Sequence, residues 1–191
     1  MASHHLCSGL YVVGRDLIRS PEEVVNQDIS RFDIFDWRDD FYYTVNQKGK
    51  TATVSIKGGP SWTSKYNGDQ GCTILPQGTS DVFFERSSIE SKLPDAATQQ
   101  WPTGDVEAYA LRPQLNEALN WAMSRKEQNT RALLVIHRGK IIGERYAGGF
   151  GKNTPQISWS QGKSITAALI GVLVHQGEHK LDDRAPVAEW Q

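Results

Sequence analysis

The sequence predicts an α+β fold, and three patterns in its 191 residues carry this prediction. The first is a β-rich stretch at 41–59 that is interrupted by Gln47, Lys48 and Gly49, as in a hairpin. The second is a pair of β-rich runs, RALLVIH and IIGERYAGG, on either side of the short turn RGK. The third is helical spacing of apolar residues at 115–122 and again after residue 160. Hairpins together with separate helices are typical of α+β proteins.

The first hundred residues otherwise favour short strands and loops. Residues 68–81, GDQGCTILPQGTSD, are rich in turn formers around one short apolar stretch. Residues 90–105 contain Pro94, Pro102 and Gly104, which predicts a linker that runs over the surface. The sequence has no internal repeat and no low-complexity tract.

Two helices are predicted in the second half of the chain. Pro113 suits the first turn of the earlier one, whose apolar positions are Leu115, Ala118, Leu119 and Ala122. The glycine-rich segment 147–156 leads into the later one, whose apolar stripe is Ile165, Leu169, Val172 and Leu173. Gly177 is a natural end for this helix, and Pro186 suits the first turn of a following segment.

Composition and charge exclude several classes of function. Apolar residues make up 38% and charged residues 23% of the chain, as in ordinary globular proteins. The net charge of -1 gives no reason to expect nucleic acid or an anionic membrane as a partner. The longest apolar run, 167–174, is broken by Gly171 and is far shorter than the roughly 20 residues of a membrane span. The start, MASHHLCSGLYVV, has neither a basic segment nor a cleavable apolar one, so a signal peptide is not expected in this chain.

Cys7 and Cys72 permit one disulfide or two unpaired buried thiols. A bridge would imply an oxidising compartment and would stabilise the fold by about 4 kcal/mol in the chain-entropy model. No Cys-x-x-Cys spacing is present, and the one His-x-x-x-His pair, His175 and His179, has no cysteine pair to complete a ligand set, so we expect no structural zinc site.

Ser160 and Lys163 lie three residues apart at the start of the later helix, in the stretch ISWSQGKSITAALIGVLVHQG. One interpretation is structural, with Ser158 or Ser160 capping the helix and Lys163 solvated. The other is catalytic, because a spacing of three places both side chains on one face and the helix start offers free N–H groups. An amine can act as a base only when burial and neighbouring cations favour its neutral form, and the apolar stripe could supply that setting.

Residues 130–190, TRALLVIHRGKIIGERYAGGFGKNTPQISWSQGKSITAALIGVLVHQGEHKLDDRAPVAEW, resemble the N-terminal half of the serine β-lactamase-like hydrolases. Within that superfamily the chain is most similar to the class C-type esterases and the 6-aminohexanoate-dimer hydrolases. The resemblance covers residues 105–191 and implies a β-lactamase/transpeptidase-like antiparallel sheet flanked by helices, with Ser160 starting a buried helix. Residues 1–104 would form an N-terminal extension that packs on this catalytic domain.

The resemblance also implies roles for individual residues. Ser160 would be the nucleophile that forms an acyl-enzyme, with its backbone N–H as half of an oxyanion hole, and Lys163 the general base. No metal or organic cofactor is expected, and the substrate would be a small ester or amide. HLCSGLYVVGRD and DQGCTILPQG resemble the extension of exported bacterial members, in which Cys7 and Cys72 would pair, so a periplasmic or extracellular location is expected.

The chain departs from the family pattern in one respect. Complete members carry a Tyr-x-Asn-type element and a C-terminal strand with a Lys- or His-containing triplet, and neither occurs before Gln191. We therefore expect that the chain alone is inactive and that a C-terminal half on a second chain completes the site. The alternative is a truncated or degenerate member that acts as a binding or scaffold module.

Other candidate chemistry is weaker. An α/β-hydrolase needs Gly-x-Ser-x-Gly, but Ser158 stands where the first glycine is required. His137 ends a predicted strand and His175 lies far along the helix from Ser160, so structural or solvated roles are favoured for both. Asp182 and Asp183 are expected to cap or flank the next segment. Trp159 either lines the pocket or packs against its neighbours.

Overall fold

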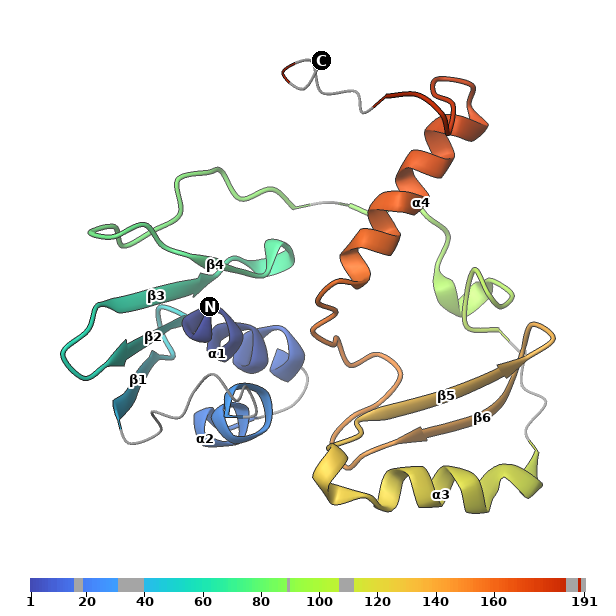
Figure 1. Ribbon diagram of the computed structural model, residues 1–191, viewed down its shortest axis with the longest axis horizontal. Coiled ribbons are helices and arrows are strands. Elements are labelled where there is room, and N and C mark those ends of the chain that lie inside the picture. The colour runs from blue at the N-terminus through green and yellow to red at the C-terminus, as the bar shows by residue number, and fades with distance from the viewer. Residues whose placement is uncertain (16–18, 31–39, 89, 107–111, 185–188, 190–191) are drawn as a thin grey trace. The chain divides into compact units, whose positions relative to one another are not determined.

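A computed structural model describes residues 1–15, 19–30, 40–88, 90–106, 112–184 and 189 (Figure 1). The described chain is mixed, with helices and two antiparallel sheets, which confirms the α+β class. It forms two compact units, Met1–Pro155 and Gln156–Gln191, which are described separately below. The more specific β-lactamase-like arrangement stays a prediction.

The first sheet is a meander of four antiparallel strands in the order β1-β2-β3-β4 (Figure 1). The strands are β1 (Phe41–Asn46), β2 (Thr51–Ile56), β3 (Ser61–Tyr66) and β4 (Cys72–Ile74). The predicted hairpin at 41–59 is confirmed, with Asn46 paired to Thr51. Its turn is held by a hydrogen bond from the Gly49 N–H to Asn46 Oδ1, and Lys50 takes the left-handed conformation with φ of 48°.

Helix α1 (Ala2–Tyr11) packs on this sheet and forms the main core with it. Leu6, Cys7 and Leu10 from the helix lie buried in the same cluster as Ala52 and Val54 from β2. The helix contradicts the prediction of only strands and loops in the first hundred residues. Its serines, histidines and glycine are poor helix formers, and burial of its apolar side against the sheet overrides their weak propensity.

A second helical segment follows, as α2 (Pro21–Val24) continues into the π-helical turn η2 (Val25–Ile29). Ser20 and Glu23 form a capping box, in which Ser20 Oγ accepts from the Glu23 N–H and Glu23 Oε2 accepts from the Ser20 N–H. Val24 and Ile29 are buried in the core beneath α1. The prediction was wrong here too, although Ser-x-x-Glu followed by apolar residues is a recognisable helix start.

The second sheet is the predicted hairpin of β5 (Ala132–His137) and β6 (Lys140–Tyr146). The predicted preceding helix is also present as α3 (Asn116–Ser124), entered through a 3₁₀ turn that begins at Pro113. Leu119 of α3 is buried against Gly143, where an added Cβ would lie 2.9 Å from a Leu119 methyl carbon. The predicted surface linker at 90–105 is largely exposed and contains the short 3₁₀ turn η5 (Ala96–Thr98) and Gln100, which forms an isolated β-bridge with Val106.

The second unit is built around α4 (Gln161–His175), the predicted helix after Ser160. The predicted end is confirmed, because Gly177 takes φ of 80° and donates to the Val174 carbonyl while Glu178 donates to that of Leu173. No residue of α4 is buried, whereas the family resemblance implies a buried helix. The described part of this unit contains no second helix or strand that could cover it, and Pro186 lies outside the described residues.

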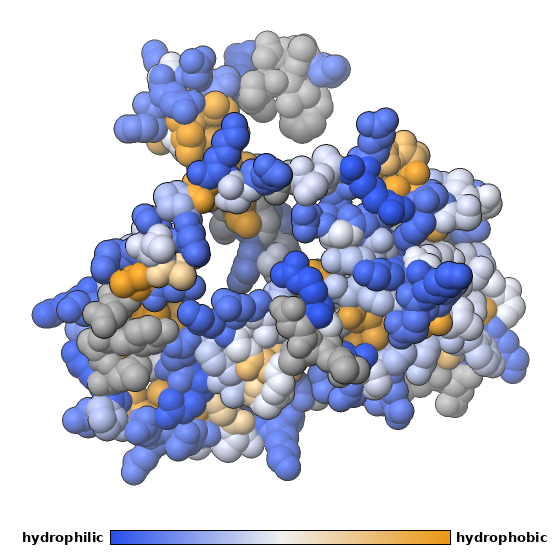
Figure 2. Space-filling view, turned by 180° about the vertical axis from the view of Figure 1, so that it is seen from behind, coloured by the Kyte–Doolittle hydropathy of each residue, from blue (hydrophilic) through white to orange (hydrophobic). Residues whose placement is uncertain are grey.

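The apolar stripe of α4 is therefore on the surface. Ile165 and Leu169 are each 62% exposed and Val172 is 50% exposed, while Leu173 is half-buried. Figure 2 shows hydrophobic side chains along the surface of this helix.

Candidate active site

The turn before α4 holds Ser160 at the N-cap position. Three successive N–H groups, of Gln161, Gly162 and Lys163, donate to the carbonyls three residues earlier at 3.0 to 3.3 Å. Trp159 has φ of 46°, a left-handed conformation that is uncommon outside glycine and is found at functional sites. This left-handed backbone conformation directly before the serine was not predicted, because a tryptophan does not favour it.

The Lys163 amine donates a hydrogen bond to Ser160 Oγ, with 2.9 Å between Nζ and Oγ. The two side chains meet because residues three apart stand on the same face of a helix. Ser160 makes no side-chain capping bond, which counts against the helix-cap role, whereas the exposure of Lys163 agrees with the structural interpretation, so the catalytic role stays a prediction. A separation of 2.9 Å lies within the range in which a proton passes directly between a hydroxyl and an amine.

Both residues of this pair are exposed. In the described residues, none accepts a hydrogen bond from the Ser160 backbone N–H. That donor is therefore available to the oxygen of a carbonyl bound at Ser160, as half of an oxyanion hole requires. Trp159, directly before Ser160 in the chain, is 58% exposed, and its role in a substrate pocket stays a prediction.

Two histidines were considered as alternative bases. His175 is the last residue of α4, and fifteen residues of helix place it roughly 22 Å along the axis from Ser160. His137 ends β5 in the other unit and is exposed. Asp183 Oδ2 accepts from the Lys180 N–H at 2.7 Å, which closes a turn, while residues 185–188 of the segment that Asp182 and Asp183 were expected to cap or flank lie outside the described residues.

Cys7 and Cys72 form the expected disulfide, which joins α1 to β4 across 65 residues of sequence. Both cysteines are buried in the core. Over the described part of the chain, no three His, Cys, Asp or Glu side chains come together as a metal site would need. Among those same residues, no helix has both the length and the apolarity to cross a bilayer.

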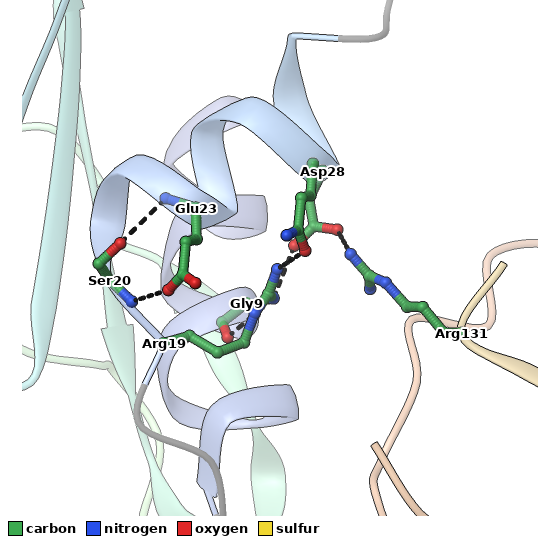
Figure 3. A network of polar contacts seen from close by, with 7 residues as sticks. Gly9, Arg19, Ser20, Glu23, Asp28 and Arg131 are labelled. Atoms are coloured by element: carbon green, nitrogen blue, oxygen red, sulfur yellow. Dashed lines mark hydrogen bonds and ion pairs between the residues drawn. The ribbon is translucent and has the colours of Figure 1, made fainter. Parts of the chain in front are cut away.

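An ionic network within the first unit was not predicted (Figure 3). Asp28 lies between two arginines, accepting from Arg19 Nη1 at 2.8 Å and from Arg131 Nη2. Arg19 also donates to the Gln27 side chain at 2.9 Å and to the Gly9 carbonyl at 3.3 Å. The side chains of Arg19 and Asp28 are only 6% and 7% exposed, so each charge depends on its partners.

The network fixes the start of β5 to the N-terminal helices and also involves the glycine-rich loop after β6. The Arg131 guanidinium lies 5.1 Å from the centre of the Phe150 ring, and the Arg131 carbonyl accepts from the Ala147 N–H at 2.9 Å. Arg131, which precedes β5, thus contacts the residues that follow β6, at the start of the loop that leads to the Ser160 helix.

No protein-family model, characterised protein or solved structure matches this chain. The β-lactamase-like family is therefore a proposal that depends on the motifs and on the geometry of the pair.

Proposed function

We propose that this protein is a serine hydrolase of the β-lactamase-like superfamily, which cleaves an ester or amide bond through an acyl-enzyme on Ser160. The observation that supports it is the 2.9 Å contact between Lys163 Nζ and Ser160 Oγ at the start of an apolar helix. The hairpin of β5 and β6 and the glycine-rich loop precede this helix in the order that the family resemblance implies.

In the proposed reaction, the neutral Lys163 amine accepts the Ser160 hydroxyl proton as Oγ attacks the carbonyl carbon of the substrate. The Ser160 N–H stabilises the negative oxygen of the tetrahedral intermediate. The intermediate collapses, the bond to the leaving group breaks, and Lys163 returns the proton to the departing alcohol or amine. Water then attacks the acyl-serine by the same proton path, which releases the acid and restores the hydroxyl.

The exposure of Lys163 supports a further part of the proposal, that another segment covers the site in the active enzyme. In contact with water a lysine amine stays protonated at neutral pH, whereas in an apolar setting its neutral form is favoured. We propose that a C-terminal half, outside residues 1–191, packs on the apolar face of α4 and supplies the second oxyanion donor. Turnover would then need both halves, and the chain by itself would be inactive.

A second candidate function is a binding or scaffold module without catalysis. The observation that favours it is the same exposure, since three stripe residues of α4 that are at least half exposed form a surface suited to a partner. Covalent labelling separates the two functions, because a scaffold does not need a reactive serine.

The disulfide supports a proposed location in an oxidising compartment, because such bridges persist mainly in exported proteins. The precise compartment, periplasmic or extracellular, is part of the proposal.

The test is modification by a fluorophosphonate and by a β-lactam, with the proposed second half present. Intact-mass spectrometry followed by peptide mapping should find a single adduct on Ser160, and Ser160→Ala should abolish it. Ser158→Ala is the matched control, because Ser158 is an exposed serine of the same turn and its loss should leave labelling unchanged. An adduct on another serine, or none with both halves present, would refute the hydrolase proposal.

A further inference from the structure

A cavity of about 330 Å³ opens on the first unit, and neither Ser160 nor Lys163 is among the residues that line it. It lies where the turn between α3 and β5 meets the loop after β6, and Gln27 from the middle of η2 contributes to its wall. Its volume is at the lower end of the range for small-molecule sites, which indicates a compact ligand.

The lining is cationic. Arg125, Lys126 and Arg131 all contribute to it, and none of the described lining residues is acidic. Arg125 pairs with Glu127 and Arg131 with Asp28, and neither of these carboxylates lines the cavity. These pairs fix the directions of both guanidinium groups while their remaining N–H donors are left for a ligand.

A neutral donor adds to these charges. The Gln27 carbonyl oxygen accepts from Arg19 Nη2 at 2.9 Å, which orients the amide. Its nitrogen then has two N–H donors, and none of the described residues accepts from them. A wall that combines cations with an oriented amide nitrogen favours an anion over a cation or a neutral group.

The remaining wall is apolar. Met123 and Phe150 line the cavity and are both half-buried, and the Phe150 ring stacks beneath the Arg131 guanidinium. A bare inorganic anion would leave this surface in water, whereas an anion with a small hydrocarbon body would cover it.

We infer that the first unit contains a binding site for a small organic carboxylate with a compact apolar body. This inference does not depend on the proposed hydrolase activity, because none of the residues involved belongs to the Ser160 turn.

The experiment is a titration of the full ¹⁵N-labelled chain with benzoate at low ionic strength, followed by the amide signals of Asn129, Thr130 and Gly148. Benzamide is the neutral control ligand of the same shape, and inorganic phosphate tests the need for the apolar body. We expect benzoate to bind at least tenfold more tightly than either control.

Lys126→Gln removes one lining charge from an exposed position, and Lys140→Gln is the matched control at the tip of the β5–β6 hairpin, outside the lining. One ion pair at about 4 Å in water amounts to about 1 kcal/mol, so Lys126→Gln should weaken benzoate binding by about fivefold. Lys140→Gln should leave it unchanged, and about 0.5 M salt should weaken it in the wild type.

Three results would overturn the inference. These are equal binding of benzoate and benzamide, equal or tighter binding of phosphate, and an unchanged affinity in Lys126→Gln. Absence of any benzoate-induced shift in the three reporter signals would overturn it as well.

Discussion

Opening the Cys7–Cys72 disulfide tests the N-terminal core directly. The bridge closes a loop of 65 residues between α1 and β4. In the chain-entropy model, a cross-link of that separation restricts the unfolded chain enough to stabilise the fold by about 4 kcal/mol. For a unit of this size, each kcal/mol shifts the melting temperature by about 2 to 4 °C, so reduction should lower it by roughly 8 to 16 °C.

The measurements are thermal unfolding and urea unfolding, both followed by far-ultraviolet circular dichroism, with and without a reductant. Reduction keeps both sulfur atoms in the core, so the comparison isolates the cross-link from packing. We also expect a steeper dependence on urea after reduction, because the unfolded chain without the bridge exposes more surface. The double variant Cys7→Ala, Cys72→Ala is the control, and a reductant should not change its stability.

Oxidised and reduced proteins whose stabilities agree within about 1 kcal/mol would refute this reasoning, since the model gives several times that value. So would two free thiols in protein purified from an oxidising compartment.

Three further predictions follow from the described side chains. With both halves present, Lys163→Ala should lower the rate of acylation of Ser160 by several orders of magnitude. Lys163→Arg should not restore that rate, because arginine keeps its proton. A near-normal rate in Lys163→Arg would show that the positive charge at position 163 is needed and that a basic amine is not. The Lys65 amine, with the Val82 N–H and Arg86, lowers the pKa of Asp81 to about 2. The stabilisation of the fold by the ionised Asp81 carboxylate should therefore be fully present above the ordinary carboxyl pKa and be lost as the pH falls through about 2. A titration of the Asp81 carboxyl group by NMR checks this, and Lys65→Gln should raise the pH at the midpoint of that titration. The exposed face of α4 should bind a hydrophobic dye, and Ile165→Ser with Leu169→Ser should remove most of that fluorescence; an unchanged signal would place the dye elsewhere.

The sequence was sufficient for those elements whose cause is local. Both hairpins were predicted because β-rich runs flank short turns with glycine, and Gly139 and Lys50 do take left-handed conformations there. The contact between Ser160 and Lys163 was predictable for the same reason, since helical spacing alone brings the two side chains together.

The sequence was insufficient for elements that are stabilised by residues far apart in the chain. Helix α1 has weak intrinsic propensity and is stabilised by the sheet and by the bridge to Cys72, which lies far along the chain. The network of Arg19, Asp28 and Arg131 joins residues up to 112 positions apart, and no spacing rule connects them. The capping box at Ser20 is the exception, because its pattern, Ser-x-x-Glu followed by apolar residues, is local and visible in the sequence.

The close fit of Leu119 against Gly143 determines more than the packing of one helix. Because Gly143 on β6 has no side chain, Leu119 of α3 can approach the strand closely. Met123 lies near the end of α3, Arg125 follows this helix, and both residues line the cationic cavity. Ala147, the residue that follows the same strand, also lines the cavity. Because α3 and β6 both lead into the lining, we expect a larger residue at 143 that displaces Leu119 to change the shape of the cavity without changing one of its lining groups.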